Sequence, residues 1–180
     1  MRSVQMLTAA TVCLLIAGQG AAAEKLKVGD PAPGFSLPAA TRDSILASKV
    51  TLAEFTGKSV VILAFYPADW SGGCTKEMCM MRDNLAELGD LGAVVLGISG
   101  DYVYSHREWA RALGLPFILL SDHNHAVAKA YESYIEGRDL NTRTIYVVNT
   151  KGTIAYIDTE YKSGTPESFD KLTRALSSIH

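Results

Sequence analysis

The sequence has little cysteine, and none of it is arranged in the C-x-x-C spacing. Its 180 residues contain three cysteines, Cys13, Cys74 and Cys79. A C-x-x-C pair is the usual mark of a thiol–disulfide oxidoreductase. The missing spacing therefore disfavours a disulfide-exchange enzyme.

A charge excess of one sign is also lacking. Lys and Arg together number 17, Asp and Glu number 19, and the formal net charge is −2. This balance gives no reason to expect nucleic acid or an acidic membrane surface as a partner. Internal repeats, linkers and low-complexity segments are missing as well, so the chain beyond its N-terminus is expected to be one domain with a sizeable core.

Only one long apolar run is present, and it lies at the N-terminus. Arg2 precedes apolar residues 6–18, and three alanines, residues 21–23, stand before Glu24. This order is typical of a secretory signal peptide, and the run is too short for a stable membrane anchor. We expect cleavage after Ala23, loss of residues 1–23 with Cys13, and a mature domain of residues 24–180 in the periplasm or outside the cell.

The stretch between Val60 and Cys79 carries the chemistry. Val60–Tyr66 is a continuous apolar run that predicts a buried strand, and a loop rich in Pro, Asp, Ser and Gly follows it. Ser71 is a candidate N-cap, which places Cys74 at the third position of a helix. Unpaired N–H groups and the helix dipole stabilise a thiolate there relative to a thiol. The predicted helix buries four residues at helical spacing: Met78, Met81, Leu85 and Leu88.

Cys79 follows Cys74 by five positions. On a helix this spacing separates the two Cα atoms by roughly 8.5 Å. Disulfides require Cα atoms closer than about 7 Å, so the two sulfurs can bond only if the first turns of the helix unwind. The pair is therefore expected to be reactive rather than a permanent structural bridge, which would in any case close too small a loop to add much stability.

These residues resemble the peroxiredoxins, specifically the bacterioferritin comigratory protein or Q-type branch of the AhpC/TSA superfamily. The motif of that family is Pro, three residues, Thr or Ser, two residues and Cys, represented here by Pro67, Ser71 and Cys74. The Q-type branch adds a resolving cysteine five positions later, as Cys79 does. One departure is Gly72, where the family usually has Pro.

The resemblance extends from about Lys27 to Ile179 and includes the opening residues 28–35. It also includes residues 142–148, in which the family places its active-site arginine, here Arg143, on a strand. It implies a thioredoxin-like fold, a three-layer α/β/α sandwich with the N-terminal extension of peroxiredoxins. Strands alternating with helices, then a hairpin and a last helix, are consistent with that order.

The resemblance further implies a thiol-dependent peroxidase that reduces hydrogen peroxide and organic hydroperoxides without a cofactor or metal. The Cys74 thiolate attacks the peroxide, and Ser71, the Cys74 N–H and Arg143 bind and polarise its oxygens. By resemblance Glu77 orients Arg143, and Pro67 shields the thiolate from water. The product is a sulfenic acid, which Cys79 converts to a Cys74–Cys79 disulfide. A thioredoxin-like dithiol is the expected reductant, and the protein is expected to be a monomer or weak dimer.

The remaining elements follow from periodicity and from turn and cap residues. We predict strands at residues 50–55, 93–99 and 116–120, helices at 75–91, 104–113, 122–131 and 166–179, and a hairpin of 143–148 with 153–158.

His106, His123 and His125 are not assigned a role in the chemistry. His123 and His125 lie beside Asp122 at a helix start, where a cap needs the aspartate, so we predict no metal site. His106, between charged neighbours such as Arg107, is predicted on the solvated face of its helix.

Three other functions stay open at this stage. A periplasmic thiol–disulfide oxidoreductase on the same fold would normally carry C-x-x-C and would leave Arg143 without a task. A peroxide sensor that signals through its unwinding helix would share the chemistry but recycle poorly. A family member made inactive by Gly72 would keep the fold alone.

Overall fold

The computed structural model describes residues 25–179, so the predicted signal peptide, its cleavage site and Cys13 lie outside the described residues. The strands are β1 (Ser36–Leu37), β2 (Ala39–Ala40), β3 (Val50–Thr51), β4 (Val60–Phe65), β5 (Ala93–Ser99), β6 (Ile118–Ser121), β7 (Tyr134–Ile135), β8 (Leu140–Asn141), β9 (Thr144–Val148) and β10 (Ile154–Asp158). The helices are η1 (Leu52–Glu54), a 3-10 turn, and the α-helices α1 (Gly72–Asp83), α2 (Leu85–Asp90), α3 (Val103–Leu113), α4 (Ala126–Ala130) and α5 (Pro166–Ser177).

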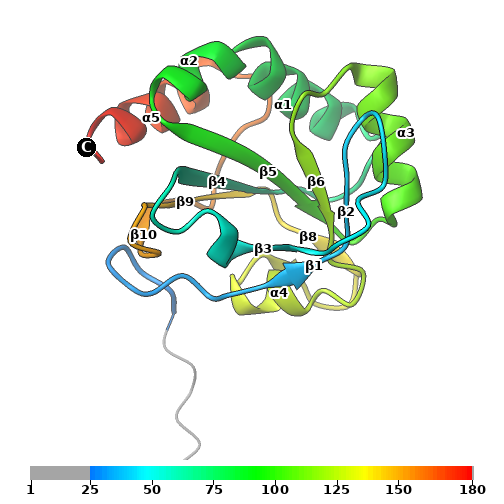
Figure 1. Ribbon diagram of the computed structural model, residues 1–180, viewed down its shortest axis with the longest axis horizontal. Helices are drawn as coiled ribbons and strands as arrows, with labels where there is room; N and C mark the ends of the chain where they lie inside the picture. Colours follow the sequence, from blue (N-terminus) through cyan, green and yellow to red (C-terminus); the bar gives the residue numbers. More distant parts are fainter. Residues whose placement is uncertain (1–24, 180) are drawn as a thin grey trace, which may run out of the picture.

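Six strands form one mixed sheet in the order β10-β9-β4-β5-β6-β2, seen nearly edge-on in Figure 1. Strands β4, β5 and β6 are parallel, as expected of strands joined through helices, whereas β2, β9 and β10 run antiparallel to their neighbours. Every residue of β4 is buried, because this central strand is covered on both faces. Its continuous apolar run thus reflects its place in the sheet.

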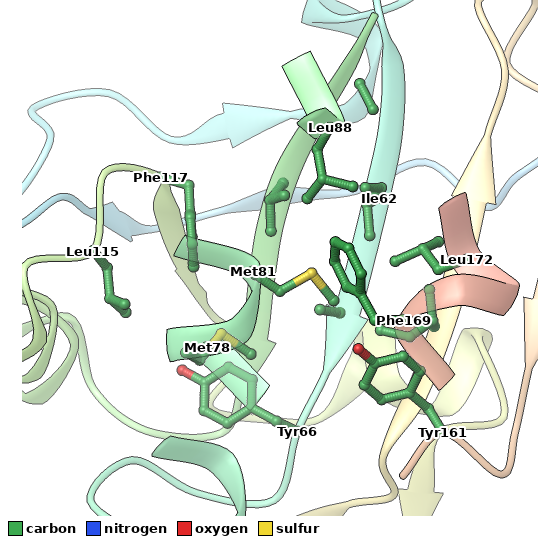
Figure 2. Packing of buried hydrophobic residues seen from close by; sticks show 14 of the residues in the cluster. Ile62, Tyr66, Met78, Met81, Leu88, Leu115, Phe117, Tyr161, Phe169 and Leu172 are labelled. Carbon is green, nitrogen blue, oxygen red and sulfur yellow. The ribbon is translucent and has the colours of Figure 1, made fainter. Parts of the chain in front are cut away.

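Four helices, α1, α2, α3 and α5, cover one face of the sheet (Figure 1). In Figure 2 the side chains of Met78 and Met81 from α1, Leu88 from α2 and Phe169 and Leu172 from α5 meet over this face. All five are nearly or fully buried. The apolar stripe of the first helix therefore fixes α1, with its Cys74, against the sheet.

The opposite face is covered by α4 and by the N-terminal segment that carries β1 and β3 (Figure 1). Phe35 and Leu37 of that segment pack in one cluster with Val127 and Tyr131 from α4 and its C-terminal end. Helices lie on both faces of this mixed sheet, so the three-layer α/β sandwich expected from the sequence is confirmed. Within residues 25–179, none of the helices combines the length and apolar character needed to cross a membrane.

The helix predicted at residues 75–91 is two helices. The first begins at Gly72, and Asn84 separates it from α2. The Asn84 side-chain amide donates to the Met80 carbonyl at 2.8 Å, and its backbone leaves the helical region at φ −111° and ψ 18°. Asparagine competes in this way with the helical ladder, which explains why the apolar spacing alone did not reveal the break.

Two other predicted elements are shorter than expected. The strand at 50–55 ends at Thr51, where Glu54 accepts hydrogen bonds from the Thr51 N–H and hydroxyl and the chain turns into η1. The helix at 122–131 begins only at Ala126, because the Asp122 carboxylate caps it from outside. The strand at 93–99 and the C-terminal hairpin are confirmed, with β9 and β10 paired antiparallel.

Candidate active site

Ser71 begins the first helix in the manner its sequence position predicts. Its backbone is extended, at φ −75° and ψ 141°, and its hydroxyl accepts a hydrogen bond from the Cys74 N–H at 3.4 Å. The same hydroxyl donates to the Ala68 carbonyl at 3.1 Å. Cys74 therefore occupies the third position of α1, among N–H groups that have no partner within the helix.

Cys74 is fully buried, and its sulfur faces a guanidinium group. Arg143 Nη2 donates to Cys74 Sγ at 3.5 Å, and the Arg143 side chain is 19% exposed. Gly73 permits this approach, since a Cβ at that position would lie 3.1 Å from Arg143 Nη2. The guanidinium and the helix N-terminus both place positive charge beside the sulfur.

The register between β4 and β9 explains why Cys74 and Arg143, 69 positions apart, are in contact. These strands are antiparallel, and Phe65 at the end of β4 faces Thr144 at the start of β9. The chain that leaves β4 for the Cys74 loop and the residue that precedes β9 are thus neighbours. Arg143 lies just before β9 rather than on a strand, which corrects the prediction of a strand position.

Glu77 anchors the other side of the guanidinium. Its carboxylate oxygen Oε2 accepts from Arg143 Nη1, and the Glu77 side chain is fully buried. Burial raises the pKa of Glu77 to about 7, although the positive charge of Arg143 opposes the rise. Burial also works to lower the pKa of Arg143, but the charges of Glu77 and Cys74 outweigh it and raise that pKa. The guanidinium therefore stays charged and fixed in place.

The other two predicted site residues lie on the same loop and helix. Pro67 is half-buried at the start of the loop that leads to Ser71. Cys79 is half-buried one and a half turns beyond Cys74 on α1, and both cysteines are free thiols. With α1 intact, the helical spacing keeps their sulfurs apart.

Two buried oxygens near this site have no hydrogen-bond partner among residues 25–179, Glu77 Oε1 and the Tyr161 hydroxyl. Burial raises the pKa of Tyr161, and the neighbouring negative charge of Glu77 raises it further. Tyr161 lies in the segment between β10 and α5, and Figure 2 shows its ring beside Phe169. Sequence reasoning did not identify this tyrosine, which has no motif around it.

A buried polar network beneath the loop was also missed. His106, predicted on a solvated helix face, is fully buried and pairs with the Asp69 carboxylate at 2.9 Å, which overturns that prediction. Its position three residues before the buried Trp109 and four before the buried Ala110 was the available signal. The charged neighbours on the other side of the helix obscured it.

The histidines beside Asp122 have different partners. His125 Nδ1 lies 3.0 Å from Asn141 Oδ1, and His123 Nδ1 lies 3.0 Å from the Gly100 carbonyl. The Asp122 carboxylate accepts from the N–H groups of Val127 and Ala128 and thus serves as a cap. No cluster of three or more His, Cys, Asp or Glu suited to a metal ion occurs within residues 25–179.

Comparison with known proteins places this site in a family. Residues 28–157 match the AhpC/TSA family. Peroxiredoxin Q, chloroplastic, of Triticum aestivum is 41% identical over 143 residues, covering 78% of this chain and 63% of that protein. A Coxiella burnetii protein provisionally named as a peroxiredoxin is 36% identical over 138 residues, covering 73% of this chain and 87% of that one.

Solved structures give the same result. The crystal structure of peroxidoxin BcpB from Mycobacterium tuberculosis superposes with a TM-score of 0.75 at 28% identity, covering 86% of this chain and 99% of that one. The chain spans about six-tenths of the length of the plant relatives it matches, 63% of the Triticum protein and 59% of an Oryza sativa peroxiredoxin Q. The matched residues include Ser71, Cys74, Glu77 and Arg143 and most of the chain, and the protein therefore belongs to the AhpC/TSA family, with peroxiredoxins of the Q and bacterioferritin comigratory type among its relatives.

Proposed function

We propose that the protein is a thiol-dependent peroxidase that reduces hydrogen peroxide and organic hydroperoxides. The observation that carries the proposal is the Arg143 guanidinium, which contacts the Cys74 sulfur with one nitrogen and the buried Glu77 carboxylate with another. A fixed cation beside a thiolate at a helix N-terminus stabilises negative charge on sulfur and then on a leaving oxygen. The similarity to named peroxiredoxins supports the same activity.

The chemical step is a two-electron displacement at oxygen. The Cys74 thiolate attacks the terminal peroxide oxygen, a sulfur–oxygen bond forms, and the oxygen–oxygen bond breaks. Sulfur is oxidised to a sulfenic acid, and the other oxygen leaves as alkoxide or hydroxide and takes a proton to become alcohol or water. The Cys74 N–H and Arg143 are the donors that meet the two peroxide oxygens, and the Ser71 hydroxyl joins them when it leaves the Ala68 carbonyl. The Cys74 N–H and the Ser71 hydroxyl are hydrogen-bonded to each other at a long 3.4 Å, a contact that a peroxide oxygen can replace.

Cys79 completes the cycle in this proposal. Its thiol attacks the Cys74 sulfenic acid, water leaves, and a disulfide forms. Because the helical spacing holds the sulfurs apart, the first turns of α1 must unwind before this bond can form. A dithiol of the thioredoxin type then reduces the disulfide and is itself oxidised.

The test is stoichiometric oxidation of the reduced protein. One equivalent of hydrogen peroxide should consume both thiols, and mass spectrometry should locate a Cys74–Cys79 disulfide. A Cys79→Ser variant should stop at the Cys74 sulfenic acid, and a Cys74→Ser variant should not react. A reduced protein that consumes peroxide no faster than free cysteine would overturn the proposal, and insulin reduction at a rate exceeding peroxide turnover would favour disulfide exchange instead.

We also propose that residues 1–23 direct export and are removed after Ala23. The basic start, the short apolar run and the three alanines support this. The full chain can be expressed in a bacterium with two membranes and recovered by osmotic shock. N-terminal sequencing should begin at Glu24, whereas a protein that stays in the cytoplasm with its first residues intact would exclude export.

A further inference from the structure

The loop between β4 and α1 is anchored to the protein interior by Asp69, whose side chain is fully buried. We infer that Asp69, paired with His106, is a positioning residue that fixes this loop and so sets the places of Ser71 and Cys74 for reaction with a peroxide. The inference rests on the proposed function and adds to it a group that touches none of the reacting atoms.

The Asp69 carboxylate accepts three side-chain hydrogen bonds. Oδ2 accepts from the Ser105 hydroxyl at 2.7 Å and lies 2.9 Å from His106 Nδ1. Oδ1 accepts from the Tyr66 hydroxyl at 2.8 Å, and the pKa of Tyr66 is raised by burial and by the charge of Asp69. Both oxygens of this buried carboxylate therefore have hydrogen-bond partners, which fix the orientation of the side chain.

His106 faces an acceptor at each ring nitrogen. Nδ1 faces the Asp69 carboxylate, and Nε2 lies 3.2 Å from the Leu120 carbonyl. Nδ1 also lies 3.4 Å from the Tyr66 hydroxyl, so the buried ring is held by hydrogen-bond partners on both sides. The Asp69–His106 pair thus ties the loop to α3 through a buried hydrogen bond.

The backbone and the next residue are held as well. The Asp69 N–H donates to Asp101 Oδ2 at 2.8 Å, and Trp70 Nε1 donates to the Ser105 hydroxyl at 3.1 Å. Trp70 has φ +62°, a left-handed conformation that a bulky residue adopts only when its surroundings impose it. The very next residue is the Ser71 cap, so the direction in which the chain leaves Trp70 determines where its hydroxyl points.

Stability alone does not account for such a pair. Replacing a buried ion pair by apolar residues of similar volume is often neutral or stabilising, so the pair is weak evidence for a contribution to folding. The Asp69–His106 pair instead fixes the position of the chain just before the Ser71 cap. A reacting group misplaced by about 1 Å can lose on the order of a hundredfold in rate, which makes the loop position sensitive.

Asp69→Asn tests the inference because it keeps the shape and removes the charge. The variant is made in a Cys79→Ser background, so that only the Cys74 reaction is followed. Two second-order rate constants are measured, for hydrogen peroxide and for iodoacetamide. Peroxide needs the aligned donors of the loop, whereas alkylation needs only an accessible thiolate. We expect the peroxide rate to fall about ten- to a hundredfold and the alkylation rate to change less than about threefold.

Asp122→Asn is the matched control. Asp122 is likewise a fully buried aspartate, but its carboxylate caps α4. Both rates should stay at the values of the Cys79→Ser parent in this control. His106→Gln should reproduce the selective loss of peroxide reactivity. The double variant with Asp69→Asn should lose little more, because each single variant already breaks the same Asp69–His106 pair. If Asp69→Asn does not fold, His106→Gln supplies the test.

Two results would overturn the inference while leaving the proposed function intact. One is a peroxide rate in Asp69→Asn equal to that of the Cys79→Ser parent. The other is a parallel change of the peroxide and alkylation rates, which would reflect general exposure of Cys74. If that parent itself reacts with peroxide no faster than free cysteine, the proposed function fails, and the failure is visible before any loop variant is compared.

Discussion

Arg143 contacts Cys74 from 69 positions away, with Nη2 3.5 Å from the buried sulfur. The contact depends on the antiparallel pairing of β4 with β9, which brings the residue before β9 to the end of β4. Glu77 binds the other side of the guanidinium and keeps the Arg143 side chain from rotating away from Cys74. A cation held in this manner is already in place when charge develops on the peroxide oxygens, and needs no reorganisation to stabilise it.

Arg143→Gln should slow oxidation of Cys74 by hydrogen peroxide about a hundred- to a thousandfold, the loss typical of removing one donor to a developing oxyanion. Stopped-flow measurement of the tryptophan signal or competition with a reference thiol gives the rate. Arg107→Gln is the control, since Arg107 pairs with Glu108 on the outer face of α3. A rate within threefold of the unmutated protein would remove Arg143 from the mechanism.

Glu77 should make the protein less stable as the pH rises from about 4.5 to about 7. Burial holds its pKa near 7 in the folded state, above the ordinary value of 4.5. Between these values the folded state binds more protons than the unfolded state, so the free energy of unfolding falls as the pH increases, and above about 7 it changes no further from this cause. The whole effect is at most about 3 kcal/mol.

Urea unfolding of Glu77→Gln, compared with the unmutated protein at pH 5 and pH 8, measures this effect. The variant should lose less stability across that interval because its amide does not titrate. Glu87→Gln, on an exposed position of α2, should follow the unmutated protein. Equal losses in all three proteins would mean that Glu77 is ionised throughout the range.

Oxidation should unwind the start of α1. A disulfide between Cys74 and Cys79 requires their Cα atoms to approach from roughly 8.5 Å on a helix, so about one to two helical turns must open. Far-ultraviolet circular dichroism at 222 nm should weaken by roughly four to eight residues of helix after one equivalent of peroxide, and recover with a dithiol. In Cys79→Ser the first peroxide should still be reduced with no loss of helix signal. An unchanged spectrum in the fully disulfide-bonded protein would contradict the unwinding.

The sequence allowed local parts of the site to be predicted and left its tertiary parts open. Ser71 as the cap and Cys74 at the third helical position follow from short-range chemistry, and the structure has both. The contact between Cys74 and Arg143 was available only through family resemblance, because it depends on strand register. His106 was wrongly assigned to solvent because its charged neighbours gave a polar local pattern, whereas burial against Tyr66 and Asp69 is decided by the packing of α3.

Tyr161→Phe should stabilise the protein by about 1 kcal/mol, because it removes a buried hydroxyl that has no partner among the described residues. Tyr131→Phe is the contrasting variant, since the Tyr131 hydroxyl donates to the Pro33 carbonyl at 2.7 Å. Its loss should cost about 1 kcal/mol. Denaturant unfolding of both variants gives the comparison. Destabilisation by Tyr161→Phe equal to that by Tyr131→Phe would show that the Tyr161 hydroxyl is hydrogen-bonded, with Glu77 Oε1, the other buried oxygen without a partner among the described residues, as the candidate acceptor.

Gly72→Pro should stabilise the helix start and slow formation of the disulfide. Gly72 is the first residue of α1, where proline is favoured, and a Cβ there meets no atom within 4 Å. The extended Ser71 backbone is the conformation that a following proline requires. The gain should be about 0.4–1 kcal/mol, by reducing the freedom of the unfolded chain.

The same rigidity opposes the unwinding that lets Cys79 reach Cys74. The first oxidation by peroxide should therefore keep its rate in Gly72→Pro while disulfide formation, followed as a second kinetic phase, becomes slower. Gly73→Ala gives the opposite pattern, since its Cβ would press on Arg143 Nη2 at 3.1 Å and slow the first phase. If Gly72→Pro slows the first phase as strongly as Gly73→Ala does, Gly72 contributes to the reaction with peroxide itself. The first turn of α1 then affects the peroxide step as well as disulfide formation, and the two steps do not depend on separate parts of the structure.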